Sequence, residues 1–142
     1  MRQLMPTSPT TQTGSSLRRT KAAIWARVST EEQRSANQTA ELEEWARAKN
    51  LDVVWTYELQ ESTYTGGHRR ILEEVYRDAH RGKFEVLLVW ALDRLTREGA
   101  REALEIFNKL DGFGVQVLSY QETWTATGSP ELRSLLISIT AW

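Results

Sequence analysis

Residues 85–92 of this chain (Glu-Val-Leu-Leu-Val-Trp-Ala-Leu) form an almost continuous apolar run. Such a run is typical of a central strand in a parallel sheet, because helices cover that strand on both faces. The polar residues 93–97 (Asp-Arg-Leu-Thr-Arg) follow the run at once. Ligands of open α/β sheets bind beyond the carboxyl ends of the strands, so residues 93–97 are a candidate site.

A second apolar run, residues 22–28 (Ala-Ala-Ile-Trp-Ala-Arg-Val), predicts another short buried strand, and Ser29 follows it directly. Ser29 comes two residues after Arg27, which suggests a nucleophile that faces an anionic substrate. A simpler interpretation is that Ser29 and Thr30 cap the helix that follows, as Ser and Thr often do. This stretch alone leaves both interpretations open.

Helical patterns separate the strands. Apolar residues recur at helical spacing over residues 35–49, 70–81 and 97–110. Ser129, Pro130 and Glu131 are typical of a helix start, and the helix that they begin is expected to continue to the last residue, Trp142.

Further strands are predicted over residues 52–57 and 115–120, with a short extra strand over 122–125. The alternation of strands and helices predicts an α/β fold. We expect a flavodoxin-like, open, mostly parallel sheet of four to five strands in the order 2-1-3-4, with helices on both faces.

The composition predicts one folded domain. Residues 1–20 are rich in Thr, Ser, Pro and Gly and lack periodic apolar positions, which predicts a disordered N-terminal tail. Residues 21–142 are expected to form the domain, and we expect this domain to be cut off within its C-terminal long helix. The chain has 142 residues, of which 40% are hydrophobic. Three of its tryptophans, Trp45, Trp55 and Trp90, are expected on buried faces.

Several classes of protein are excluded or disfavoured by composition. The chain has no cysteine, which excludes disulfides and thiolate metal sites. No apolar run is long enough for a membrane span, and the N-terminal residues lack the apolar core of a secretory signal. A cytoplasmic location without membrane contact is therefore expected. The formal net charge of −1 gives no overall indication of nucleic-acid binding.

The predicted strand order nevertheless brings polar segments together. In the order 2-1-3-4, Ser29 and residues 93–97 leave adjacent strands at the same edge of the sheet. The loop predicted over residues 58–68, which contains Ser62, leaves strand two at that edge. Arginines gather near these strand ends, and a local basic cluster can bind phosphate in a nearly neutral protein. They are Arg27, Arg69, Arg70, Arg94 and Arg97.

The residue types at this edge favour phosphoryl chemistry. The two histidines, His68 in the predicted loop and His80 at a helix end, are expected on the surface, so no acyl-transfer triad is indicated. No residues near the motifs have the spacing of metal ligands, and Gly66-Gly67 lacks the pattern of a nucleotide-binding loop. Arginine forks match the oxygens of a phosphodiester. No cofactor is therefore expected.

Residues 26–33 (Ala-Arg-Val-Ser-Thr-Glu-Glu-Gln) and 92–97 (Leu-Asp-Arg-Leu-Thr-Arg) each follow a predicted strand. Together they resemble the catalytic domain of the serine recombinases, the resolvase/invertase family that includes large serine integrases and related transposases. The resemblance extends from about residue 22 to 142. It implies site-specific recombination of double-stranded DNA through a 5′-phosphoserine intermediate. It also implies a homodimer and a synaptic homotetramer in the intact protein.

The resemblance implies a role for individual residues as well. Ser29 matches the nucleophile, and Asp93 matches the acidic residue that orients the arginines. The residues that match the phosphate-binding arginines are Arg27, Arg94 and Arg97. Gln38 is the favoured one of two glutamines after the nucleophile; the other, Gln33, suits helix capping equally well. Ser62 and Arg69 match the serine and arginine of a mobile loop.

The chain departs from the family pattern in this loop. Thr63 stands where the family usually has a small residue, and Arg69 comes one position later than usual, so that Arg70 is an alternative. The family's dimer interface and DNA-binding domain are expected to lie beyond Trp142. Two other functions remain open: a non-catalytic α/β module that binds an anion or a partner, and a truncated element that persists as an interaction fragment.

Overall fold

The computed structural model describes residues 18–28, 32–60, 64–126, 135 and 137–138, which are called here the described part of the chain. Ser29, Ser62 and Thr63 lie outside it, as do most of the predicted tail and most of the predicted final helix. The side chain of Gln33 is also outside it.

The described part forms a four-stranded sheet in which all neighbouring strands are parallel. The strands are β1 (Thr20–Val28), β2 (Leu51–Gln60), β3 (Val86–Val89) and β4 (Gln116–Ser119), in the order β2-β1-β3-β4. This order confirms the predicted α/β fold. Strand β3 is buried at every position, as its apolar sequence predicted for a central strand.

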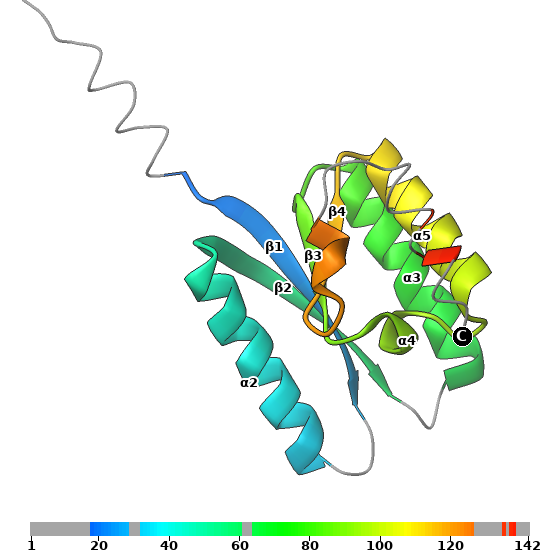
Figure 1. Cartoon of the computed structure of the whole chain (residues 1–142), viewed down its shortest axis with the longest axis horizontal. Coiled ribbons are helices and arrows are strands. Elements are labelled where there is room, and N and C mark those ends of the chain that lie inside the picture. The colour runs from blue at the N-terminus through cyan, green and yellow to red at the C-terminus, as the bar shows by residue number, and fades with distance from the viewer. Residues whose placement is uncertain (1–17, 29–31, 61–63, 127–134, 136, 139–142) are drawn as a thin grey trace, which may run out of the picture.

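Helices cover both faces of this sheet (Figure 1). Helix α2 (Glu32–Ala48) lies on one face, while α3 (Tyr64–His80) and α5 (Ala100–Gly112) lie on the other. Successive side chains of a strand point to opposite faces. Ala22 and Ile24 of β1 therefore pack in the core on the α2 side, whereas Ala23 and Trp25 pack on the α3 and α5 side.

Two short helical elements complete the described part. Helix α4 (Leu92–Leu95) is a single turn directly after β3, and the 3-10 helix η2 (Thr123–Ala126) follows β4. The extra strand predicted over residues 122–125 was therefore wrong. Side-chain hydrogen bonds favour the turn: Thr125 Oγ1 accepts from the Ser119 N–H and donates to the Glu122 carbonyl.

Two further predictions from the sequence were wrong. Helix α3 begins at Tyr64, within the predicted loop 58–68, and β2 extends to Gln60. Trp55, which was expected to be buried, is 59% exposed. It lies on the edge strand β2, beside an irregularity in the β1–β2 register between Ala22 and Ala23.

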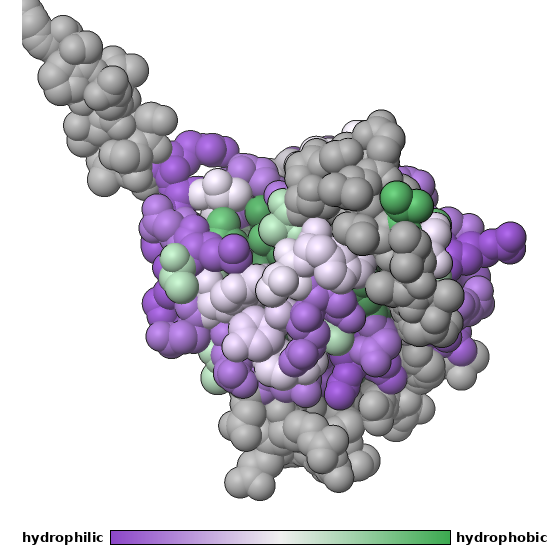
Figure 2. All heavy atoms as spheres, in the orientation of Figure 1, coloured by the Kyte–Doolittle hydropathy of each residue, from purple (hydrophilic) through white to green (hydrophobic). Residues whose placement is uncertain are grey.

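The surface of the described part is mainly hydrophilic on the face shown in Figure 2, and the apolar residues visible there are scattered. No helix in the described part is long and apolar enough to cross a membrane.

Candidate functional site

The segment after β3 lies beside the end of β1, as the strand order predicted. Arg27 is the second-last residue of β1, and its Nη1 donates a hydrogen bond of 3.5 Å to the backbone carbonyl of Asp93. The Asp93 side chain itself is exposed. Two motifs that are far apart in the sequence therefore meet at one edge of the sheet.

Three of the predicted site residues, Arg27, Gln38 and Arg94, line one narrow pocket at this edge. They come from β1, from α2 and from α4. All three are half-buried. The remaining lining residues are uncharged, so the two guanidinium groups give this pocket a positive charge. Arginine donates charge-assisted hydrogen bonds to phosphate oxygens. The pocket measures only about 10 Å³, room for about one water molecule, so a phosphate would meet these guanidinium groups at the mouth of the pocket.

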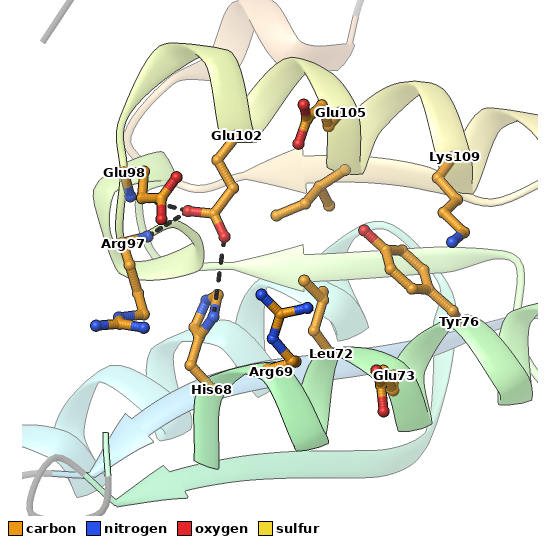
Figure 3. Close-up of a pocket in the computed structure, with 11 residues that line it drawn as sticks. His68, Arg69, Leu72, Glu73, Tyr76, Arg97, Glu98, Glu102, Glu105 and Lys109 are labelled. Atoms are coloured by element: carbon orange, nitrogen blue, oxygen red, sulfur yellow. Dashed lines mark hydrogen bonds and ion pairs between the residues drawn. The ribbon is translucent and has the colours of Figure 1, made fainter. Parts of the chain in front are cut away.

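Two other predicted residues, Arg69 and Arg97, line a separate cleft of about 290 Å³ between α3 and α5 (Figure 3). Arg70, the alternative to Arg69, is exposed and is not among the residues that line this cleft. The cleft mixes charges of both signs: its acidic lining residues are Glu73, Glu98, Glu102 and Glu105, and Lys109 lies 4.5 Å from the centre of the Tyr76 ring.

The backbone explains why Arg94 and Arg97 line different pockets although they belong to one segment. Helix α4 ends at Leu95, and Thr96 is extended, with φ −110° and ψ 159°. Gly99 then has φ 91°, a conformation that glycine adopts without steric cost, before α5 begins at Ala100. Leu92 and Leu95 are buried and anchor the segment in the core.

His68 contradicts the prediction of a surface residue, because it is only 3% exposed. Its Nε2 lies 2.9 Å from the backbone carbonyl of Leu95, and its ring meets Trp25 edge-on at 5.6 Å. The glycines before it indicated a loop, but α3 already includes this position. The missed signal is helical spacing, since His68 lies three, four and seven residues before Ile71, Leu72 and Val75. His80 is exposed, as expected.

The sequence also gave no indication of three side chains that bond to the segment after β3. Trp25 Nε1 donates to the Arg94 carbonyl at 2.9 Å. Glu122 Oε1 accepts from the Leu92 N–H at 3.1 Å. Glu102 accepts from the backbone N–H groups of Arg97 and Glu98 at 2.6 and 2.9 Å. Each lies more than three residues from its partner, on a strand, loop or helix whose position the sequence alone did not fix.

The cleft also contains the phenol of Tyr76, whose pKa is raised. Burial, together with the charges of Glu102 and Glu105, raises the pKa of its hydroxyl from 10.0 to about 12. No group of three or more His, Asp or Glu residues in the described part could hold a metal ion.

Comparisons with known proteins add to this geometry. A family model described as "Resolvase, N terminal domain" matches residues 22–142. The N-terminal catalytic domain of TP901-1 integrase is 25% identical, with a TM-score of 0.67, and the match covers 84% of this chain and 92% of that chain. The C-terminal catalytic domain of ISC1926 TnpA, an IS607-like serine recombinase, is 28% identical, with a TM-score of 0.57 and coverage of 84% and 79%.

A resolvase family site-specific recombinase from Streptococcus pneumoniae shares the fold, with a TM-score of 0.69 at 20% identity, and the match covers 86% of each chain. A search of curated protein sequences gave no significant match.

Proposed function

The chain belongs to the resolvase N-terminal domain family of serine recombinases, and from this premise we propose that it catalyses site-specific DNA recombination with Ser29 as the nucleophile. The proposed substrate is double-stranded DNA. The proposed assembly, in the intact protein, is a homodimer that pairs into a synaptic homotetramer.

The proposed reaction exchanges one phosphodiester for another. Ser29 Oγ attacks a DNA phosphorus and loses its proton, while the bond from phosphorus to the 3′ oxygen breaks. The products are a 5′-phosphoserine link and a 3′ hydroxyl, which gains a proton as it leaves. A 3′ hydroxyl of the recombining strand then attacks the phosphoserine, which restores Ser29. Because the number of phosphodiesters is conserved, the reaction consumes no nucleotide.

The observation that carries this proposal is the pocket lined by Arg27, Gln38 and Arg94. Arg27 lies two residues before Ser29 in the sequence, and its guanidinium bonds to the segment that contains Arg94. Positive charge at this place would stabilise the negative charge that develops on the phosphate oxygens. The loss of one such preorganised donor typically costs about 3 kcal/mol of barrier, or about a hundredfold in rate.

The other predicted residues have proposed roles around this centre. Asp93 would hold Arg27 through its carbonyl and orient the arginines through its side chain. Gln38 would donate a hydrogen bond to the bound phosphate. Arg97, Arg69 and Ser62 would approach the DNA when it binds, and these three roles rest on the resemblance to the family.

The direct test is the covalent intermediate. The protein is incubated with DNA fragments from its own genetic neighbourhood, the adduct is trapped and digested, and mass spectrometry identifies the side chain that carries the nucleotide. We expect a 5′-linked nucleotide on Ser29 and none in Ser29→Ala.

The matched control is Ser62→Ala, which should still form the adduct on Ser29. An adduct on Ser62 would keep the reaction and overturn the assignment of the nucleophile. If the folded protein binds DNA and forms no adduct, the proposed reaction is wrong and a non-catalytic binding module becomes the better interpretation.

A further inference from the structure

The segment after β3, residues 92–98, has little regular structure of its own. It contains one helical turn, α4, followed by extended backbone at Thr96. A single turn of helix is unstable in isolation, because nucleation fixes several residues for one hydrogen bond. Side chains from other elements must therefore determine where this segment lies.

His68 of α3 supplies one of these contacts. Its Nε2 lies 2.9 Å from the Leu95 carbonyl, and because a carbonyl only accepts, this nitrogen carries the proton. The imidazole is buried, and its ring packs edge-on against Trp25, whose indole N–H bonds to the Arg94 carbonyl. The backbone carbonyls of the consecutive residues Arg94 and Leu95 are thus held by two aromatic side chains that contact each other.

Glu102 of α5 holds the other end of the segment. One oxygen, Oε1, accepts from the N–H groups of Arg97 and Glu98, while Oε2 lies 3.9 Å from His68 Nδ1 (Figure 3). The Glu102 side chain is 18% exposed. A carboxylate that accepts two backbone N–H groups makes stronger bonds than a neutral acceptor does.

We propose that His68 and Glu102 together form a clamp that fixes the backbone carrying Arg94 and Arg97, which makes them positioning residues for DNA cleavage. The consequence for cleavage rests on the proposed function. The simpler interpretation is that Glu102 only caps α5 and that His68 only fills the core. In that case both residues would affect stability without affecting the rate at which bound DNA is cleaved.

The first part of the test measures the clamp without DNA. In the whole chain, NMR hydrogen exchange follows the amides of Arg97 and Glu98 in the wild type, Glu102→Ala and Glu102→Gln. We expect exchange at both amides to accelerate on the order of tenfold in Glu102→Ala, since a charge-assisted bond to each is lost. Glu102→Gln keeps an acceptor oxygen and should recover most of the protection. Unchanged exchange in Glu102→Ala would overturn the clamp.

The second part measures single-turnover adduct formation at saturating DNA, with DNA affinity determined separately. His68→Leu fills the buried position with an apolar side chain and leaves the Leu95 carbonyl without the Nε2 donor. We expect its cleavage rate to fall between about tenfold and a hundredfold, the usual cost of displacing a reacting group by about 1 Å, with affinity changed less than about threefold. His68→Gln retains an N–H donor and should recover most of the rate.

Tyr57→Phe is the control for stability. It removes the hydrogen bond of 2.6 Å from Tyr57 to Asp78, which lies near Lys83 and Phe84, before β3, whereas residues 92–98 follow β3. This variant should lose stability and cleave at the wild-type rate. An unchanged rate in His68→Leu, or an equal loss in Tyr57→Phe, would overturn the positioning role. If the wild type forms no adduct, the proposed function fails, but the exchange experiment still decides whether the clamp exists.

Discussion

The two pockets beside residues 92–98 differ in the charges of the side chains that line them. The pocket of Arg27, Gln38 and Arg94 has two arginines and, among its described lining residues, no acidic side chain. The cleft between α3 and α5 sets Arg69, Arg97 and Lys109 among four glutamates. In the cleft, carboxylates compensate the cations, so little net attraction for an anion remains. The first pocket keeps a net positive charge among its described lining residues. This difference in charge supports the proposal that the phosphate is recognised at the first pocket.

The largest expected effect is on the pocket of Arg27, Gln38 and Arg94. Arg94→Ala should slow single-turnover adduct formation about a hundredfold, equivalent to about 3 kcal/mol, because one donor to the charged phosphate is lost. The matched control is Arg47→Ala on α2, which removes an exposed arginine paired with Glu44. That variant should cleave DNA at the wild-type rate. Equal rates for the two variants would contradict the assignment of the phosphate pocket.

A smaller effect is expected in the cleft at alkaline pH. The pKa of Tyr76 is raised from 10.0 to about 12, mainly by burial, so the folded protein keeps a proton that the unfolded chain loses near pH 10. The folded state therefore binds more protons between these two values, and stability should fall as the pH rises through this range.

Denaturant unfolding of the wild type and Tyr76→Phe at the two ends of this range measures this effect. The variant should lose less stability than the wild type as the pH rises. Some decrease should persist in the variant, since burial and the hydrogen bond to Asp78 also raise the pKa of Tyr57. The same pH dependence in both proteins would show that Tyr76 is not held in its neutral form by the cleft.

The smallest effect is expected for Lys109→Ala. Lys109 lies over the Tyr76 ring at 4.5 Å, and an exposed contact of this kind contributes about 0.5–1 kcal/mol to stability. Thermal unfolding should show a loss of that size, while adduct formation should be unchanged. A large loss of cleavage would instead mean that Lys109 itself contacts the DNA.

The fold could be predicted from the sequence because its strongest signals are local. The apolar runs over residues 22–28 and 85–92 identified two buried strands, and the alternation with helices indicated a parallel sheet. The strand order then placed Ser29 and residues 93–97 at the same edge of the sheet. In the structure Arg27, two residues before Ser29, contacts the Asp93 carbonyl at that edge.

The rest of the site depends on information that a local pattern does not contain. Gly66 and Gly67 indicated a loop by composition, whereas helix α3 continues through them and buries His68. Trp55 has the residue type of a buried strand position, but burial at an edge strand depends on what covers it. Glu102 bonds to backbone atoms before α5, and only the geometry of the turn at Gly99 brings them within reach.

The central claim is that Arg27 and Arg94 neutralise the scissile phosphate. The most direct test compares adduct formation by the wild type and Arg94→Ala on two DNA substrates. One substrate has a normal phosphate at the cleaved position, and the other has an uncharged methylphosphonate. Because a neutral group needs less stabilisation of charge, we predict that Arg94→Ala loses about a hundredfold on the phosphate and less than about tenfold on the methylphosphonate. An equal loss on both substrates would contradict the claim.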